Sequence, residues 1–151
     1  MAVRRLLLLS LLLALAATPA VGADSVIEKT LDVPRANAIP VQIAFQKSIL
    51  VTVESQNDPQ ENDIKEALEK DPSDKTFVLL RFHYTNDDYF AHKVRLQAQL
   101  LEGDGTVLAE GGRKGTLDAK KKDDTFSFPI KVKTLDWPKA ASLKVTATFL
   151  N

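Results

Sequence analysis

The sequence predicts an all-β protein, an immunoglobulin-like antiparallel β-sandwich of seven or eight strands with one short helix. Beyond residue 24, apolar and polar residues alternate along most of the chain, as in strands that bury one face. Clusters of Gly, Pro, Asn and Asp interrupt this alternation at short intervals, as turns do. A single stretch, at about residues 59–70, has the spacing of a helix instead.

The first 23 residues are predicted to be a signal peptide. Arg4 and Arg5 form a charged start, and residues 6–15 are almost purely Leu and Ala. This apolar run is too short to span a membrane, and Val21-Gly22-Ala23 supplies the small residues that signal peptidase prefers. We expect a Sec-type signal, because the run is too apolar for the twin-arginine route, with cleavage near Ala23. An uncleaved N-terminal anchor is the alternative.

Residues 24–151 are long enough for a single domain with its own core. Without Arg4 and Arg5, 18 basic residues remain against 20 acidic ones, so nothing suggests a nucleic-acid partner. The chain has no cysteine, which excludes disulfides, thiolate metal sites and thiol nucleophiles. It also has no Asn-x-Ser/Thr sequon. This composition fits a bacterial periplasmic or secreted protein better than an animal secreted one.

Two strands are predicted before the helix. The first covers residues 26–33 and ends at Pro34, which cannot donate a backbone hydrogen bond. The second begins at Ile39, and its alternation continues through Lys47 to Val53. This stretch is either one long bent strand or two strands with a tight break. Lys47 would point to the buried face, so we favour a bulge or corner there.

The predicted helix has clear start and stop signals. Asp58 is placed at the N-cap, Pro59 at the first helical position and Glu61 at the third, while Asp71-Pro72 ends the helix. Its apolar stripe is narrow, consisting of Ile64, Ala67 and Leu68. A stripe of this size predicts a helix lying across an end or edge of the sheets.

Residues 77–110 are predicted to form a three-stranded meander, with turns at 85–88 and 102–105. A later strand at 126–132 contains Pro129, which favours a sheet edge or a bulge. The last strand covers residues 143–149. Trp137, in the turn before it, is expected to cap one end of the sandwich.

The meander resembles the FxLYD-type family of bacterial immunoglobulin-like domains. Thr85-Asn86-Asp87-Asp88 matches the family's first turn and Asp104-Gly105-Thr106-Val107-Leu108 its second. Ala98-Gln99-Leu100-Leu101-Glu102 stands in place of the Phe-x-Leu-Tyr-Asp motif, with Leu100 identical and Glu102 conservative. The resemblance implies an exported sandwich and supplies no catalytic residues.

Motifs of known enzyme classes are absent from the sequence. There is no Gly-x-Ser-x-Gly, phosphate loop or dinucleotide fingerprint. The two histidines, His83 and His92, have opposite strand parity and no partners at metal-ligand spacing. We therefore expect no catalytic residues, cofactor or metal.

Two groups of residues are candidates for an interaction surface. The first has the outward parity of the meander: Phe77, Leu79, Arg81, His83, Lys93 and Arg95. Either the helix covers Phe77 and Leu79, which we favour, or they form an open patch for a partner. The second group is a pair of basic loops with Arg113, Lys114, Lys120, Lys121 and Lys122, which could dock on an anionic surface or simply be solvated.

Charge is distributed unevenly along the chain. Residues 54–75 carry eight acids against three bases, and residues 113–144 carry nine bases against four acids.

Taken together, the signal segment, the sandwich pattern and the absence of enzyme motifs predict an exported, non-catalytic module. We expect it to bind another envelope or extracellular macromolecule and not to span the membrane after cleavage. The alternatives are a binder of small ligands or metal ions that uses the end loops, and, more remotely, a small hydrolase.

Overall fold

The computed structural model describes residues 24–35 and 37–150, which form eight strands, one α-helix and one short 3-10 helix. The predicted antiparallel sandwich with a single α-helix is confirmed. In chain order the elements are β1 (Ser25–Asp32), β2 (Ile39–Phe45), β3 (Ser48–Gln56), α1 (Glu61–Glu69), β4 (Lys75–Asn86), β5 (His92–Leu101), β6 (Val107–Leu117), β7 (Lys121–Lys133), η1 (Trp137–Lys139) and β8 (Ser142–Leu150).

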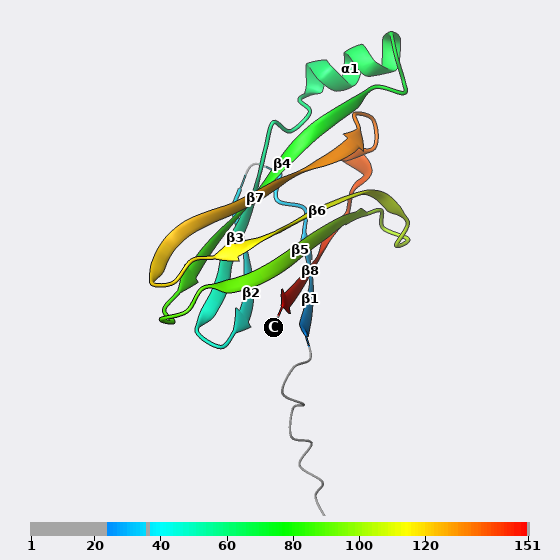
Figure 1. Cartoon of the computed structure of the whole chain (residues 1–151). Helices are drawn as coiled ribbons and strands as arrows, with labels where there is room; N and C mark the ends of the chain where they lie inside the picture. The colour runs from blue at the N-terminus through cyan, green and yellow to red at the C-terminus, as the bar shows by residue number, and fades with distance from the viewer. Residues whose placement is uncertain (1–23, 36, 151) are drawn as a thin grey trace, which may run out of the picture.

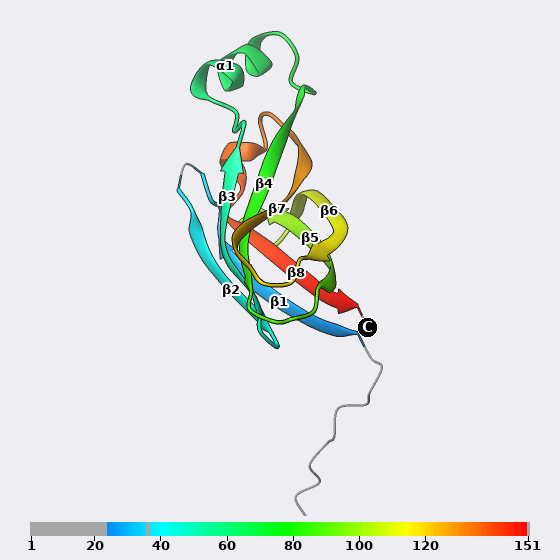
Figure 2. The same ribbon diagram turned by 60° about the vertical axis from the view of Figure 1, so that its left-hand side comes forward.

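The strands form two sheets of four that pack face to face (Figure 1). Sheet A has the order β1-β8-β5-β6, and sheet B has the order β2-β3-β4-β7. All the pairings are antiparallel. In sheet A, the first and last strands lie side by side, with Ser25 opposite Phe149 (Figure 2).

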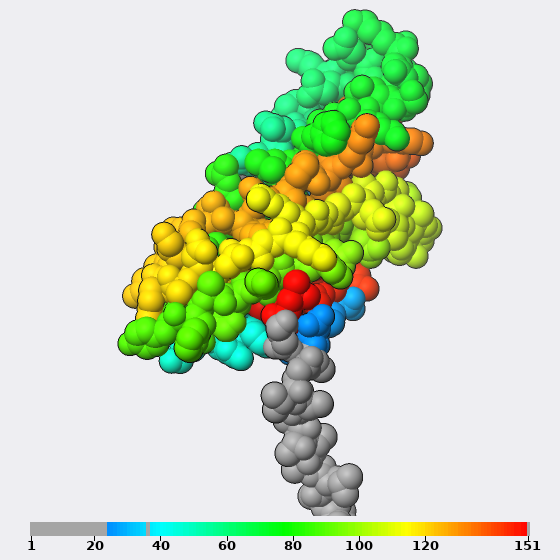
Figure 3. Space-filling model, in the orientation of Figure 1, coloured from blue at the N-terminus to red at the C-terminus, as the bar shows by residue number. Residues whose placement is uncertain are grey.

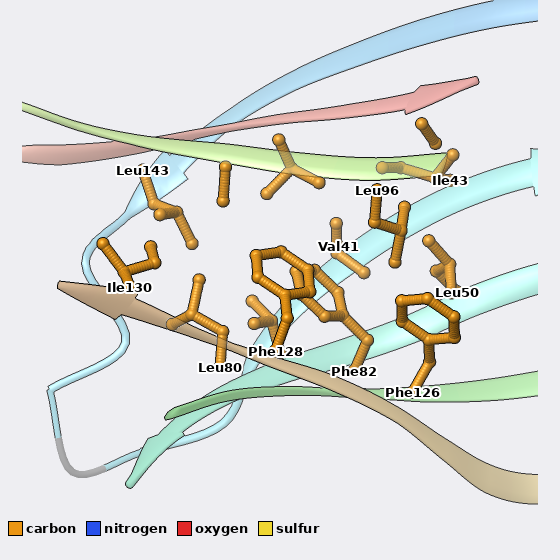
Figure 4. Close-up of a cluster of buried hydrophobic side chains, with 14 of the residues drawn as sticks. Val41, Ile43, Leu50, Leu80, Phe82, Leu96, Phe126, Phe128, Ile130 and Leu143 are labelled. Atoms are coloured by element: carbon orange, nitrogen blue, oxygen red, sulfur yellow. The ribbon is translucent and has the colours of Figure 1, made fainter. Parts of the chain in front are cut away.

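The core consists of the inward-facing residues of both sheets. Phe82 and Phe128 stack with ring centroids 5.6 Å apart, and Leu96 and Leu143 face them from sheet A (Figure 4). Each of these large side chains is almost completely buried. Burial of a side chain of this size stabilises the fold by about 1.5–3 kcal/mol, so the two sheets are held together mainly by these contacts.

The predicted meander is wrong at its first turn. The strand β4 pairs with β3 and β7 in sheet B, whereas β5 pairs with β6 and β8 in sheet A. The segment between Asn86 and His92 therefore crosses from one sheet to the other. The second turn does form the predicted hairpin, since Glu102 and Thr106 are joined by a backbone hydrogen bond of 2.9 Å.

The predicted basic loop at residues 113–114 is instead part of the long strand β6. This edge strand of sheet A lies against β7, the edge strand of sheet B. Two glycines make the close approach possible. A Cβ on Gly111 would lie 2.6 Å from the carbonyl oxygen of Pro129, and a Cβ on Gly115 would lie 2.1 Å from the ring of Phe126. The edge position of Pro129 is as predicted.

The helix begins later than predicted. The N-cap is Gln60, whose backbone N–H donates to the carboxylate of Asp63 over 2.7 Å. The predicted cap, Asp58, instead accepts a hydrogen bond of 2.8 Å from the hydroxyl of Ser55. The helix lies beyond the ends of β3 and β4 and forms a protrusion on the molecule (Figure 3). Its contacts with the strands are sparse.

Two smaller expectations are met. The break at Lys47 is a tight turn between two strands, where Gln46 has a positive φ of 48° and Lys47 is exposed. Trp137 is 3% exposed and caps the core, with the Arg35 guanidinium 5.2 Å from its ring centroid.

Within the described ranges, no helix is long and apolar enough to cross a membrane. The predicted signal peptide and its cleavage near Ala23 lie outside those ranges.

Candidate interaction surface

The outer face of sheet B carries apolar residues surrounded by cations. The register pairs Phe77 with Lys131, Leu79 with Pro129 and Lys75 with Lys133. Directly paired residues of an antiparallel ladder point to the same side of the sheet. Because Val78, Leu80 and Ile130 are buried in the core, the residues that alternate with them point outward. We call this surface the apolar–cationic face, defined by Lys75, Phe77, Leu79, Arg81, Pro129, Lys131 and Lys133.

The prediction that the helix covers this face is wrong. The Phe77 side chain is 56% exposed, and Leu79 is half-buried. The Lys131 ammonium lies 5.3 Å from the centroid of the Phe77 ring. The helix buries Ala67 instead, beyond the end of the sheet. A large aromatic residue is therefore left open on a central strand, where a cation–π contact with Lys131 partly orients it.

A charged network continues the face along β4. The Arg81 guanidinium lies 3.5 Å from a Glu54 carboxylate oxygen. The ring of His83 lies between that same oxygen, at 3.7 Å, and a carboxylate oxygen of Asp123, at 3.0 Å. Such partly exposed pairs contribute little to stability but fix the positions of the side chains. They give the face a defined polar border beside its apolar part.

The remaining cations that we predicted for this surface belong elsewhere. Lys93 and Arg95 lie on β5 in sheet A, so they point away from Phe77 and Leu79 on the opposite side of the sandwich. Arg95 is paired with Lys114 of β6. Arg113 reaches across the edge of the sandwich, where its guanidinium lies 5.7 Å from the Phe126 ring centroid. The prediction that Lys93 and Arg95 share a face with Phe77 and Leu79 is therefore wrong.

The three lysines at residues 120–122 lie at one end of the sandwich. The Lys120 ammonium is 3.5 Å from the ring centroid of Tyr89 and donates to the carbonyl of Asp87 over 2.6 Å. Tyr89 and Phe90 are 76% and 73% exposed. At this end of the sandwich four lysines stand against five aspartates: Lys47, Lys120, Lys121 and Lys122, with Asp87, Asp88, Asp118, Asp123 and Asp124. This balance does not favour docking on an anionic surface.

Hydrogen bonds shift the pKa values of several carboxyl groups in the turns. The Tyr89 backbone N–H and then the His92 ring lower the pKa of Asp88 below its usual range. The Thr125 backbone N–H and the Tyr84 hydroxyl lower the pKa of Asp124. Burial raises the pKa of Asp58, against the opposing effects of the Ser55 hydroxyl and Arg35. The Asp88 carboxylate therefore stabilises the segment between β4 and β5, and the Asp124 carboxylate stabilises the start of β7.

Two hollows are present on the described surface. One, of about 480 Å³, lies on the outer side of sheet A and is lined mainly by polar residues, including Glu28, Gln97, Gln99, Glu110, Lys144 and Thr146. The other, of about 390 Å³, lies beneath α1 and is lined by Ala67, Thr76 and several acidic residues. Sequence reasoning missed both. The first combines residues from four strands that are distant in the chain, and the second, although it lies within residues 57–76, depends on how α1 folds back toward the start of β4.

Among the described residues, no group of three or more His, Asp or Glu side chains is arranged to hold a metal ion. No protein-family model matches the chain, and a search of curated proteins finds no significantly similar sequence. The function must therefore be argued from the chemistry of the surfaces, among which the apolar–cationic face combines exposed apolar area with an unbalanced charge.

Proposed function

We propose that this protein is an exported, non-catalytic β-sandwich that binds another macromolecule of the cell envelope through the apolar–cationic face. The observation that carries the proposal is the exposure of Phe77, which is 56% accessible on a central strand. The composition of the first 23 residues supports export.

The residue types on the face fit protein recognition. Exposed aromatic residues and arginines provide much of the binding energy of protein interfaces when a partner buries them. Around Phe77 and Leu79 there are four cations, Lys75, Arg81, Lys131 and Lys133, whereas the neighbouring acid Glu54 is paired with Arg81. The complementary partner is therefore a protein segment that presents apolar and acidic side chains together.

The test uses a photo-cross-linking amino acid at position 79 in the exported full-length chain. We expect a defined adduct in the envelope, and we expect Phe77→Ala or Lys131→Glu to reduce its yield at least about tenfold, which corresponds to about 1.4 kcal/mol. The same amino acid at position 90, which is 73% exposed and lies at one end of the sandwich, serves as the control. Equal adduct yields at positions 79 and 90, or a yield at position 79 that Lys131→Glu does not change, would contradict the proposal.

A second candidate is a small-ligand protein that uses the hollow on the outer side of sheet A. The observation that favours it is the set of amides and carboxylates on four adjacent strands, a rigid support for a polar ligand. A ligand that prefers the folded state raises the melting temperature. Melting temperatures unchanged by calcium, zinc, phosphate and soluble glycans would remove this candidate.

A further inference from the structure

The apolar stripe of α1 is only partly used within its own chain. Ala67 is 4% exposed and anchors the helix, whereas Leu68 is 66% exposed. Ile64, one turn earlier on the same side as Leu68, is half-buried. The helix therefore presents a leucine outward on a protrusion of the molecule, much as β4 presents Phe77.

The charge around α1 is opposite to that of the apolar–cationic face. Residues 58–74 include seven acids and two lysines. Each lysine is held by a glutamate of the same helix: Lys65 lies 2.7 Å from Glu61, and Lys70 lies 2.8 Å from Glu66. On the face, four cations stand against Glu54. The two surfaces are complementary in charge, and each exposes a large apolar side chain.

These two surfaces do not meet within one chain. The helix is tied at both ends, to β3 at Gln56 and to β4 at Lys75, and its anchor Ala67 is buried beyond the end of the sheet. The hydroxyl of Thr134 donates to Asp74 over 2.8 Å, which also fixes the return of the chain into β4. The helix is thus held off its own apolar–cationic face, but it is free to reach the face of another molecule.

We propose that a second copy of this chain occupies the apolar–cationic face. The helix α1 of one molecule lies across β4 and β7 of the other, with Leu68 against Phe77 and Leu79, and with Glu69 toward Lys131 and Lys133. The helix and the face lie at the same end of the molecule, so each molecule can receive the other's helix while it places its own helix on the other's face. A closed two-fold dimer results, in which the contact is made twice. This inference rests on the proposed binding role of the face and names its partner.

The absence of cysteine makes a direct test possible, because an introduced pair of cysteines has no background. Chains with Leu68→Cys and chains with Phe77→Cys, carrying different tags, are mixed and mildly oxidised. A disulfide requires Cα atoms about 4.4–6.8 Å apart, so only close approach gives the mixed dimer. Val26→Cys, at a position that is 59% exposed on β1, replaces Leu68→Cys in the matched control.

We expect the mixed dimer from Leu68→Cys with Phe77→Cys to exceed the Val26→Cys control at least about tenfold. Equal yields would overturn the dimer. A chain with both Leu68→Cys and Phe77→Cys that forms its disulfide only within the same chain would also overturn the dimer, since the helix would then reach its own face.

Sedimentation equilibrium supplies an independent readout. We expect Lys131→Glu to weaken the dimer about tenfold, and we expect 1 M salt to weaken it as well, because exposed charges are screened. A monomer at all concentrations would overturn the dimer. If Phe77→Ala still abolishes the envelope adduct in that case, the proposed binding face stands without self-association. If it does not, both proposals fail.

Discussion

At the scale of a single residue, Asn86 holds together one end of the sandwich. Its side chain is fully buried and donates to the carbonyls of Phe90, at 2.9 Å, and Leu117, at 3.1 Å. It also accepts from the backbone N–H of Asp88 at 3.0 Å. One amide therefore links the crossing between the sheets to the end of β6, and it explains an asparagine that the sequence marked only as a turn residue.

Asn86→Ala is expected to destabilise the protein by about 1–3 kcal/mol, because buried carbonyl groups lose their donor. Urea unfolding monitored by tryptophan fluorescence measures the change through Trp137. Asp87→Ala, an exposed neighbour, is the control and should change stability by less than about 0.5 kcal/mol. Equal effects of the two substitutions would contradict the role of Asn86.

Gly111→Ala is expected to cost about 1–3 kcal/mol, since the added methyl group would press on the carbonyl of Pro129 and separate β6 from β7. Gly103 is the matched control, because a Cβ there meets nothing within 4 Å. Melting curves of the two alanine variants distinguish the effects. If Gly111→Ala is as stable as Gly103→Ala, the close approach of the two edge strands is wrong.

At the scale of the elements, β7 does the most to join sheet B to sheet A. Its inward residues, Phe126, Phe128, Ile130 and Val132, enter the core, while its outward residues complete the apolar–cationic face. The same strand lies against β6 at the open edge of the sandwich. The strand β7 thus contributes to the core, contacts the edge strand of the other sheet and carries part of the candidate interface.

Phe128→Ala is expected to destabilise the protein by about 3–5 kcal/mol, the range for truncation of a buried phenylalanine. Phe128 is 2% exposed, whereas Phe90 is 73% exposed and provides the control with the same change in chemistry. The free energies of unfolding in urea should differ between the two variants by at least about 2 kcal/mol. Similar values would show that Phe128 is not part of the core.

The strands could be predicted from the alternation, but their assignment to sheets could not. A period of two shows that β4 and β5 each bury one face, and it is silent about which neighbour each strand pairs with. The pairing depends on the buried bonds of Asn86, which turn the chain from sheet B to sheet A. Lys93 and Arg95 have the outward parity of Phe77 in the sequence, yet they lie on the other side of the molecule.

At the scale of the whole molecule, the candidate face depends on where α1 lies. Phe77 and Leu79 could be recognised as outward-pointing from their parity, and the narrow stripe of the helix could be recognised from its spacing. The sequence did not show that the tethers at Gln56 and Lys75 hold the helix beyond the sheet, because this follows from the lengths and directions of β3 and β4.

Stability is expected to fall in acid. The pKa values of Asp71, Asp88, Asp104 and Asp124 are lowered by hydrogen bonds in the folded state. As the pH falls, these carboxylates are therefore protonated in the unfolded state before they are protonated in the folded state. Their contribution is complete above the usual value of 3.8 and is lost as the pH falls through the lowered pKa values. Burial raises the pKa of Asp58, so ionisation of this carboxyl group opposes folding and its contribution to stability has the opposite sign.

Calorimetry should show a lower melting temperature at about pH 2.5 than at about pH 5. The double variant Asp88→Asn with Asp124→Asn should show a smaller difference between the two pH values, since two of the contributing carboxylates are gone. A wild-type melting temperature that is constant across this range would contradict the assignment.

The pairing of β1 with β8 determines how the molecule responds to a mechanical load. Ser25 lies opposite Phe149, so the outer ends of both strands are at the same end of sheet A. A pulling force applied through these ends acts along the hydrogen bonds, which run perpendicular to antiparallel strands. The ladder then opens one pair at a time, from Ser25 toward Asp32, and β1 peels away at low force. A molecule anchored through these ends would lose its first strand before its core yields.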